Sequence, residues 1–133
     1  MAAIFEQGLP KTVANHVPLS PLTFIERSAS IYPDYPAVVH GSTRRTWGQS
    51  WARCRQLASA LEKRGIQPGQ TVAAMLPNIP AMFEAHFGVP LAGCVLNTLN
   101  IRLDAEAISY MLEHGEAKAI LVDPEFAEVI QQA

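Results

Sequence analysis

The sequence has few of the residues that mark several specialised classes of protein. It contains only two cysteines, Cys54 and Cys94, which leaves no disulfide framework and indicates a reducing compartment, so we expect a cytoplasmic protein. The formal net charge is −2, which argues against nucleic acid or an anionic membrane as a partner. No apolar run approaches the length of a membrane span, and the first residues lack the pattern of a secretory signal.

Metal-binding and basic-surface motifs are also missing. The four histidines lie far apart in the sequence and form no HxxxH pattern, and there is no CxxC. Two short basic clusters, Arg44–Arg45 and Arg53–Arg55, stand beside acidic or polar positions, which favours a solvated face over an anion site. Of the 133 residues, 49% are hydrophobic and 17% are charged, which is the composition of one domain that buries a core.

Hydrophobic periodicity predicts helices that alternate with short strands, after an irregular arm over residues 1–19. Thr46 and Gln49 have the spacing of a capping box, and Gly65 suits a left-handed helix cap. We expect the three apolar strands of the second half to be buried. The expected elements are a helix from Ser20 or Thr23 to Tyr32, strands at 36–41 and 44–46, a helix over 46–64, a strand at 71–76, a helix from 80 that Pro90 kinks or ends, a strand at 94–99, a helix over 104–115, a strand at 118–122 and a helix over 124–133.

This alternation is typical of an α/β fold with a doubly wound parallel sheet. We expect a partial sheet of that kind with flanking helices, preceded by an N-terminal helix and a short hairpin. The last helix-like run, 124–133, has no glycine cap, no cationic last turn and no following proline. That pattern predicts a fragment of a longer protein, in which residues 20–133 form the first part of a truncated domain.

No motif for phosphate binding or nucleophilic catalysis follows the strands. GxGxxG, GxxxxGK[ST] and GxSxG are absent, and the turns at 77–80, 97–100 and 123–124 contain too little glycine to cradle a pyrophosphate. Asn97 and Asn100 flank the carboxyl end of an expected strand, where open α/β sheets place ligands. Turn formation is the simpler explanation for both asparagines.

The other candidate side chains have ordinary structural explanations. Asp104 and Glu106 suit the first turn of a helix better than a pair of catalytic carboxylates. His86 stands on a helix with two phenylalanines, which favours a packed or surface histidine over a ligand. Trp47 and Trp51 have helical spacing, which indicates core residues rather than a cofactor site.

Two long stretches of the sequence carry family motifs. The first reads RRTWGQSWARCRQLASALEKRGIQPGQTVAAMLPNIPAMFEAHFG, and the second reads VPLAGCVLNTLNIRLDAEAISYMLEHGEAKAILVD. They resemble the AMP-forming acyl-CoA synthetases, also called adenylate-forming or AMP-binding enzymes, from about Leu19 to the end. The segment NTLNIRL most resembles the corresponding segment of ligases for medium-chain, short-chain and methylthio-substituted carboxylic acids.

The resemblance implies a parent enzyme that converts a carboxylate, ATP and CoA to acyl-CoA, AMP and diphosphate. It implies ATP, CoA and Mg²⁺ as cofactors of that parent, and the remainder of the ligase chain and a small carboxylate as partners. The family's Ser/Thr/Gly-rich phosphate loop, its YGxTE stretch and its catalytic lysine have no counterpart here. We therefore expect this chain alone to bind none of these cofactors and to be inactive.

The resemblance places one candidate site in this chain. Asn100, Ile101 and Arg102 match family positions near the pantetheine tunnel and would form part of a CoA tunnel wall, while no catalytic or metal-binding position is matched. Two roles stay open for Arg102: contact with a CoA phosphate, or an ion pair with Glu106 four residues further on. A truncated, non-catalytic interaction or regulatory protein is the alternative function, and a homo-oligomer is an open arrangement.

Overall fold

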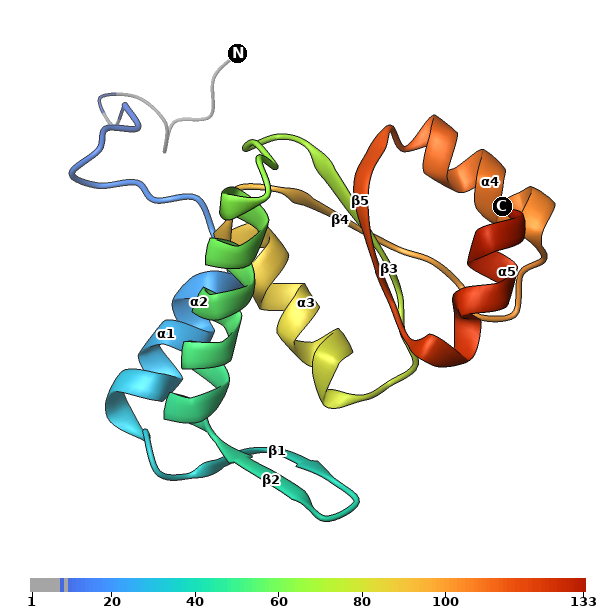
Figure 1. Cartoon of the computed structure of the whole chain (residues 1–133). Helices are drawn as coiled ribbons and strands as arrows, with labels where there is room; N and C mark the ends of the chain where they lie inside the picture. The colour runs from blue at the N-terminus through green and yellow to red at the C-terminus, as the bar shows by residue number, and fades with distance from the viewer. Residues whose placement is uncertain (1–7, 9) are drawn as a thin grey trace.

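The computed structural model describes residue 8 and residues 10–133 of the chain (Figure 1). Residues 1–7 and 9, which belong to the expected N-terminal arm, therefore lie outside the description. Residues 10–19 form no helix or strand, and their side chains are exposed. A short turn in this segment is closed by Asn15, whose Oδ1 accepts a hydrogen bond from the Thr12 N–H at 2.8 Å.

The described chain forms a three-stranded sheet, a two-stranded hairpin and surrounding helices. The elements in chain order are α1 (Pro21–Ile31), β1 (Pro36–His40), β2 (Thr43–Thr46), α2 (Trp47–Lys63), β3 (Thr71–Met75), α3 (Pro80–Leu91), β4 (Val95–Thr98), α4 (Ala105–His114), β5 (Ala117–Val122), the 3₁₀ turn η2 (Pro124–Phe126) and α5 (Ala127–Gln132). The sheet has the strand order β4-β3-β5, and both pairings are parallel. The α/β prediction is thus confirmed.

Helices cover the two faces of the sheet. The α3 crossover and α2 lie on one face, and α4 and α5 lie on the other (Figure 1). On the first face, Leu61 and Val89 pack against Val72 of β3. On the second face, Ile108 of α4 packs against Met75 of β3. Because β-strand side chains alternate in direction, successive β3 residues supply the two halves of the core.

The prediction of buried strands is correct only for the central strand. In β3, Val72 to Met75 are fully buried because other strands flank it on both sides and helices cover both faces. Most residues of β5 are half-buried, and Val95 of β4 is 54% exposed. Both of these strands lie at the margins of the three-stranded sheet, so the apolar run at 118–122 is an edge strand in this structure.

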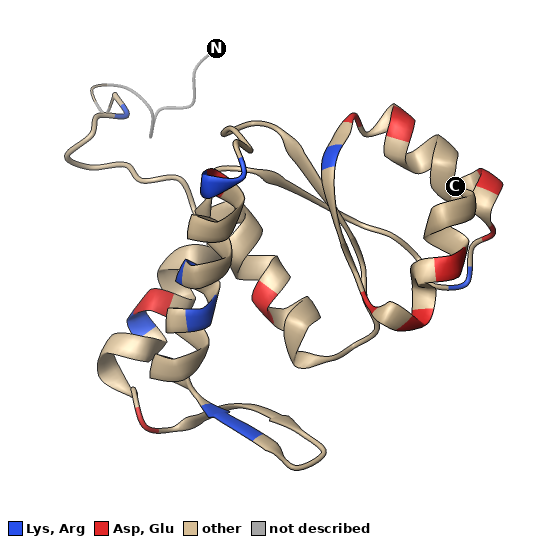
Figure 2. Cartoon of the chain, viewed as in Figure 1, with Lys and Arg blue, Asp and Glu red and all other residues tan. Residues whose placement is uncertain are grey.

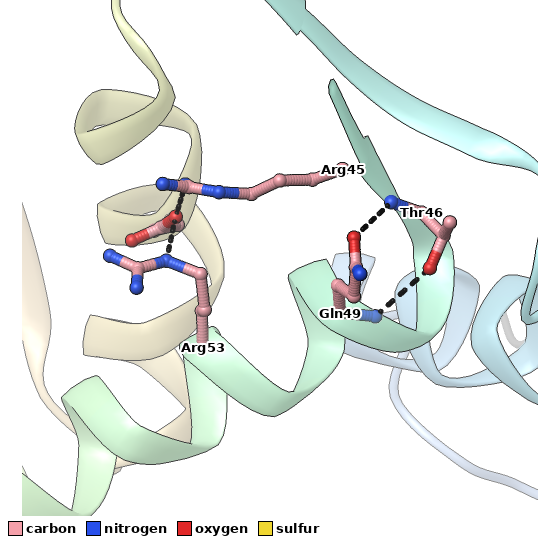
Figure 3. A network of polar contacts seen from close by, with 5 residues as sticks. Arg45, Thr46, Gln49 and Arg53 are labelled. Carbon is pink, nitrogen blue, oxygen red and sulfur yellow. Dashed lines mark hydrogen bonds and ion pairs between the residues drawn. The ribbon is translucent and has the colours of Figure 1, made fainter. Parts of the chain in front are cut away.

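The N-terminal half is fixed by local capping interactions. Ser20 caps α1 through its Oγ, which accepts from the Leu22 N–H, so the helix starts at the first of the two expected positions. The capping box at the start of α2 is confirmed: Thr46 Oγ1 accepts from the Gln49 N–H, and Gln49 Oε1 accepts from the Thr46 N–H (Figure 3). Gly65 follows α2 with a φ of 82°, the expected left-handed conformation.

Two details at helix ends differ from the sequence-based expectation. Pro90 lies within α3, and the helix ends one residue later at Leu91. The run at 124–133 is a 3₁₀ turn followed by a six-residue helix rather than one continuous α-helix. Asp123 Oδ1 accepts from the Glu125 N–H, which fixes the first turn in its tighter form.

Candidate functional site

The carboxyl ends of the three parallel strands lie together at one end of the sheet, the place where open α/β sheets bind ligands. Backbone hydrogen bonding continues to this end of the sheet. The Leu99 N–H donates to Ala74 O at 2.9 Å, and the Asp123 N–H donates to Met75 O at 3.1 Å. The loops after β4 and β5 therefore leave the sheet from fixed positions on either side of β3.

The loop after β4 carries the three candidate site residues Asn100, Ile101 and Arg102, and all three are exposed. Asn100 Oδ1 accepts a hydrogen bond from the Arg102 N–H at 3.0 Å, which confirms the turn role that the sequence favoured for this asparagine. The ion pair with Glu106, one of the two roles left open for Arg102, does not form in the structure. The Arg102 guanidinium extends from an ordered turn and has no carboxylate partner within the described chain.

Asn97 is not brought together with this loop. It lies within β4, paired with Ala73, and is half-buried beneath the end of α4. A methyl group on Gly115 would come within 2.9 Å of Asn97 Nδ2, so the glycine allows the helix end to approach the strand. Asn97 therefore packs against the end of α4 from within the strand, rather than forming the turn that the sequence favoured for both asparagines.

The remaining sequence candidates are structural. Asp104 caps α4, with Oδ1 accepting from the Ala107 N–H at 2.9 Å, as its sequence position predicts. His86 is exposed, and its Nδ1 lies 2.8 Å from Met82 O in the same helix. Trp47 and Trp51 are half-buried on α2 rather than fully in the core.

Neither cysteine is activated in this structure. Burial raises the pKa of the Cys54 thiol from 9.0 to about 11, with a smaller contribution from the carboxylate of Glu84. Burial also raises the pKa of the Cys94 thiol. A nucleophilic thiolate would need the opposite shift. The described residues contain no cluster of His, Cys, Asp and Glu suited to a metal ion, and none of their helices is long and apolar enough to span a membrane.

The sequence analysis missed a charged cluster centred on Glu84 of α3. Arg45 of β2 and Arg53 of α2 both donate to Glu84 Oε1, the latter from Nε at 2.5 Å. Figure 3 shows the two arginine side chains converging on one carboxylate. The Glu84 side chain is only 9% exposed, whereas those of Arg45 and Arg53 are 25% and 47% exposed. The hydrogen bond to Glu84 raises the pKa of Arg53.

This cluster corrects the interpretation of the two basic clusters as a solvated face. Arg44 and Arg55 are exposed as expected, and Arg53 is also exposed, but Arg45 is half-buried and both Arg45 and Arg53 donate to a buried carboxylate. The sequence did contain a signal. Glu84 is the only Asp, Glu, Lys or Arg in the otherwise apolar helix PAMFEAHFGVPL, and a lone carboxylate on such a helix needs a cationic partner.

The cluster lies beside a cavity of about 410 Å³ near the carboxyl ends of β3 and β5. Arg53 and Glu84 form its polar wall, and apolar side chains including Leu76, Leu121 and Val122 form the rest. The arrangement holds the hairpin, α2 and α3 together and presents guanidinium groups beside apolar surface.

A family model described as AMP-binding enzyme matches residues 25–133. The peroxisomal acetate/butyrate–CoA ligase of Arabidopsis thaliana is 53% identical over 118 residues, which are 89% of this chain and 21% of that protein. The acetate–CoA ligase of Humulus lupulus is 50% identical over 125 residues, or 94% of this chain and 22% of that protein. This chain therefore spans about a fifth of the length of these relatives.

Solved structures give the same result. The fatty acyl CoA synthetase of Mycobacterium tuberculosis matches with a TM-score of 0.79 at 28% identity, over 83% of this chain and 22% of that one. A benzoate CoA ligase of Burkholderia xenovorans matches with a TM-score of 0.79 at 26% identity, over 84% of this chain and 23% of that one. Because the family model covers most of the chain and the fold agrees, this chain belongs to the AMP-binding enzyme family, whose matched members are CoA ligases.

Proposed function

We propose that this chain is the N-terminal part of an AMP-forming acyl-CoA ligase, which converts a carboxylate, ATP and CoA to acyl-CoA, AMP and diphosphate. The observation that carries the proposal is the identity of about half of all aligned residues to two CoA ligases, over nearly the whole chain. In this proposal, residues 20–133 are the first part of the large N-terminal domain and residues 1–19 are an arm.

The described residues do not fit the phosphates of ATP. The turns after β3, β4 and β5 contain no glycine, and they provide no row of free backbone N–H groups of the kind that cradles a pyrophosphate. We therefore assign ATP and Mg²⁺ to the remainder of the ligase chain. The role of the present residues is to build the sheet from which that site extends.

The loop at Asn100, Ile101 and Arg102 is the part of this chain that we assign to CoA, as one wall of its tunnel. The Asn100 turn fixes the loop, and the Arg102 guanidinium has no carboxylate partner in the described chain, which leaves it available to a CoA phosphate. In the complete ligase, Arg102→Ala should raise the KM for CoA by about tenfold or more, since a charge-assisted hydrogen bond contributes about 1.5–3 kcal/mol and each 1.4 kcal/mol is about a factor of ten.

The KM for ATP should stay unchanged in that variant, and Arg27→Ala, which removes an exposed arginine of α1, serves as the control. An Arg102→Ala enzyme with an unaltered CoA KM would remove the loop from the CoA site. That result would leave the ligase function itself intact, because the two are measured separately.

We infer a short-chain aliphatic carboxylate as substrate. Support comes from the relatives at 53% and 50% identity, named for acetate, butyrate or both, while proteins named for trans-cinnamate and benzoate are 45% and 42% identical.

A cytoplasmic location rests on cysteine usage alone, and the peroxisomal names of several relatives support the peroxisome instead. Imaging of a fluorescent fusion of the complete protein distinguishes the two locations.

The ligase function is tested with the protein encoded by the complete reading frame. ATP–diphosphate exchange and acyl-CoA formation are measured with acetate, butyrate, cinnamate and benzoate. We expect exchange with acetate or butyrate, and none with the 133-residue chain alone because it contains no phosphate cradle. A complete protein that activates no carboxylate would overturn the proposed reaction.

A further inference from the structure

The charges of this chain are separated into two ends, although its net charge is only −2. Figure 2 shows Lys and Arg concentrated on α2 and the hairpin, and Asp and Glu on α4, α5 and the turn before α5. The basic end contains two acidic residues, Glu62 and the buried Glu84, beside six cations: Arg44, Arg45, Arg53, Arg55, Lys63 and Arg64. The acidic end contains two cations, Arg102 and Lys118, beside seven carboxylates: Asp104, Glu106, Glu113, Glu116, Asp123, Glu125 and Glu128.

The basic end has a groove that can receive a carboxylate. Arg44, Arg45 and Arg53 line a depression of about 480 Å³, together with the polar side chains of Gln49 and Gln56. Arg53 and Gln56 also line the adjoining apolar cavity of about 410 Å³. Each guanidinium has five N–H donors, and the single carboxylate of Glu84 uses only one from Arg45 and one from Arg53. The groove therefore has donors and positive charge in excess.

The carboxylates of the acidic end form no ion pair with other described residues. Both ion pairs formed by the described residues go to Glu84, so none involves α4, η2 or α5. Glu125 and Glu128 are both exposed and stand three residues apart, which places them on one face of the η2–α5 segment. Two adjacent carboxylates supply the hydrogen-bond acceptors and the negative charge that the arginine groove lacks.

We propose that the arginine groove is a self-association site that receives the Glu125–Glu128 face of a second copy of this chain. Like ends repel one another, so each contact joins the groove of one copy to the acidic face of another, and we place this contact head-to-tail. Leu121 and Val122 border the adjoining cavity, so apolar contact accompanies the charge pairing. Because a head-to-tail contact leaves one groove and one acidic face free, the assembly grows with protein concentration.

The test is sedimentation velocity over a range of protein concentrations at two salt concentrations. The Debye length is about 30 Å at 0.01 M salt and about 8 Å at 0.15 M, so association should be clear at the lower concentration and weaken at the higher one. Arg44→Glu should weaken association about tenfold or more, since it reverses an exposed charge of the groove. Arg27→Glu changes the net charge equally on α1 and should have little effect.

On the acidic side, the double variant Glu125→Gln/Glu128→Gln should lose association, whereas Glu106→Gln/Glu113→Gln on α4, with the same change in net charge, should keep most of it. Circular dichroism checks that each variant is folded. The sharpest test mixes Arg44→Glu with Glu125→Gln/Glu128→Gln. Each is monomeric alone, but the intact acidic face of the first fits the intact groove of the second, so the mixture forms a one-to-one dimer that grows no further.

Three results would overturn the proposal: a wild-type chain that is monomeric at low salt, an α4 control that loses association as fully as the α5 variant, or a mixture of the two complementary variants that contains no dimer. Association that is independent of salt would point to the open edges of the sheet and would equally reject the arginine groove.

Discussion

Replacing Glu84 by glutamine tests whether the buried carboxylate holds the hairpin and α2 against α3. The substitution keeps the size of the side chain and removes its charge, so both arginines lose a charge-assisted acceptor. Removing one partner of a fully buried ion pair costs about 3–5 kcal/mol. Here the Arg45 and Arg53 side chains are 25% and 47% exposed, so water recovers part of that loss.

We therefore expect Glu84→Gln to lower the free energy of unfolding by about 2 kcal/mol, the range of a lost hydrogen bond to a charged group. Urea unfolding followed by the fluorescence of Trp47 and Trp51 measures it, since both tryptophans lie on α2. The midpoint should fall with little change in the m-value. Glu62→Gln is the matched control, because Glu62 is exposed on α2 and forms no ion pair with the described residues.

A double-mutant cycle separates the two arginines. Arg45 is the less exposed partner, so its coupling with Glu84 should exceed that of Arg53, and removal of either arginine should cost less once Glu84 is neutral. The reasoning fails if the free energies of unfolding of Glu84→Gln and the Glu62→Gln control differ by less than about 0.5 kcal/mol, the spread expected for neutral surface changes. The cluster would then be a solvated surface contact that contributes nothing to the packing of α3.

Three further predictions concern local structure. Thr46→Ala should cost about 1 kcal/mol in urea unfolding, since it removes one half of the capping box, and Thr12→Ala in the exposed segment before α1 is its control. Gly88→Ala should destabilise by about 1–3 kcal/mol because the new methyl would lie 2.7 Å from Leu57 Cδ2 and 3.0 Å from Cys54 O, and a loss below 0.5 kcal/mol would mean that α2 and α3 separate easily. The raised pKa of Cys54 predicts that the free energy of unfolding is unaffected by this thiol below about pH 9 and falls as the pH rises towards 11, because the thiol of the unfolded chain ionises first. Cys54→Ala should remove this part of the alkaline loss. Parallel plots of unfolding free energy against pH for the wild-type and Cys54→Ala proteins would contradict the prediction.

The features that could be predicted from the sequence depend on contacts between near neighbours. A capping box needs residues three apart, and the left-handed conformation of Gly65 needs only the end of a helix before it. The Asn100 turn is of the same kind, since Oδ1 binds an N–H two residues on. The parallel sheet with helices on both faces followed from the alternation of strands and helices, because parallel strands require crossovers.

The features that were missed depend on contacts between distant residues. Arg45 and Glu84 are 39 residues apart, and nothing near Arg45 in the sequence distinguishes it from the exposed Arg44. Arg102 shows the opposite error: Glu106 has the correct spacing for a helix pair, but the Asn100 turn places Arg102 before the helix starts at Ala105. The i, i+4 rule applies only when both residues are helical. Sequence spacing therefore overstates the pairing of charges close together in the chain and misses that of charges far apart.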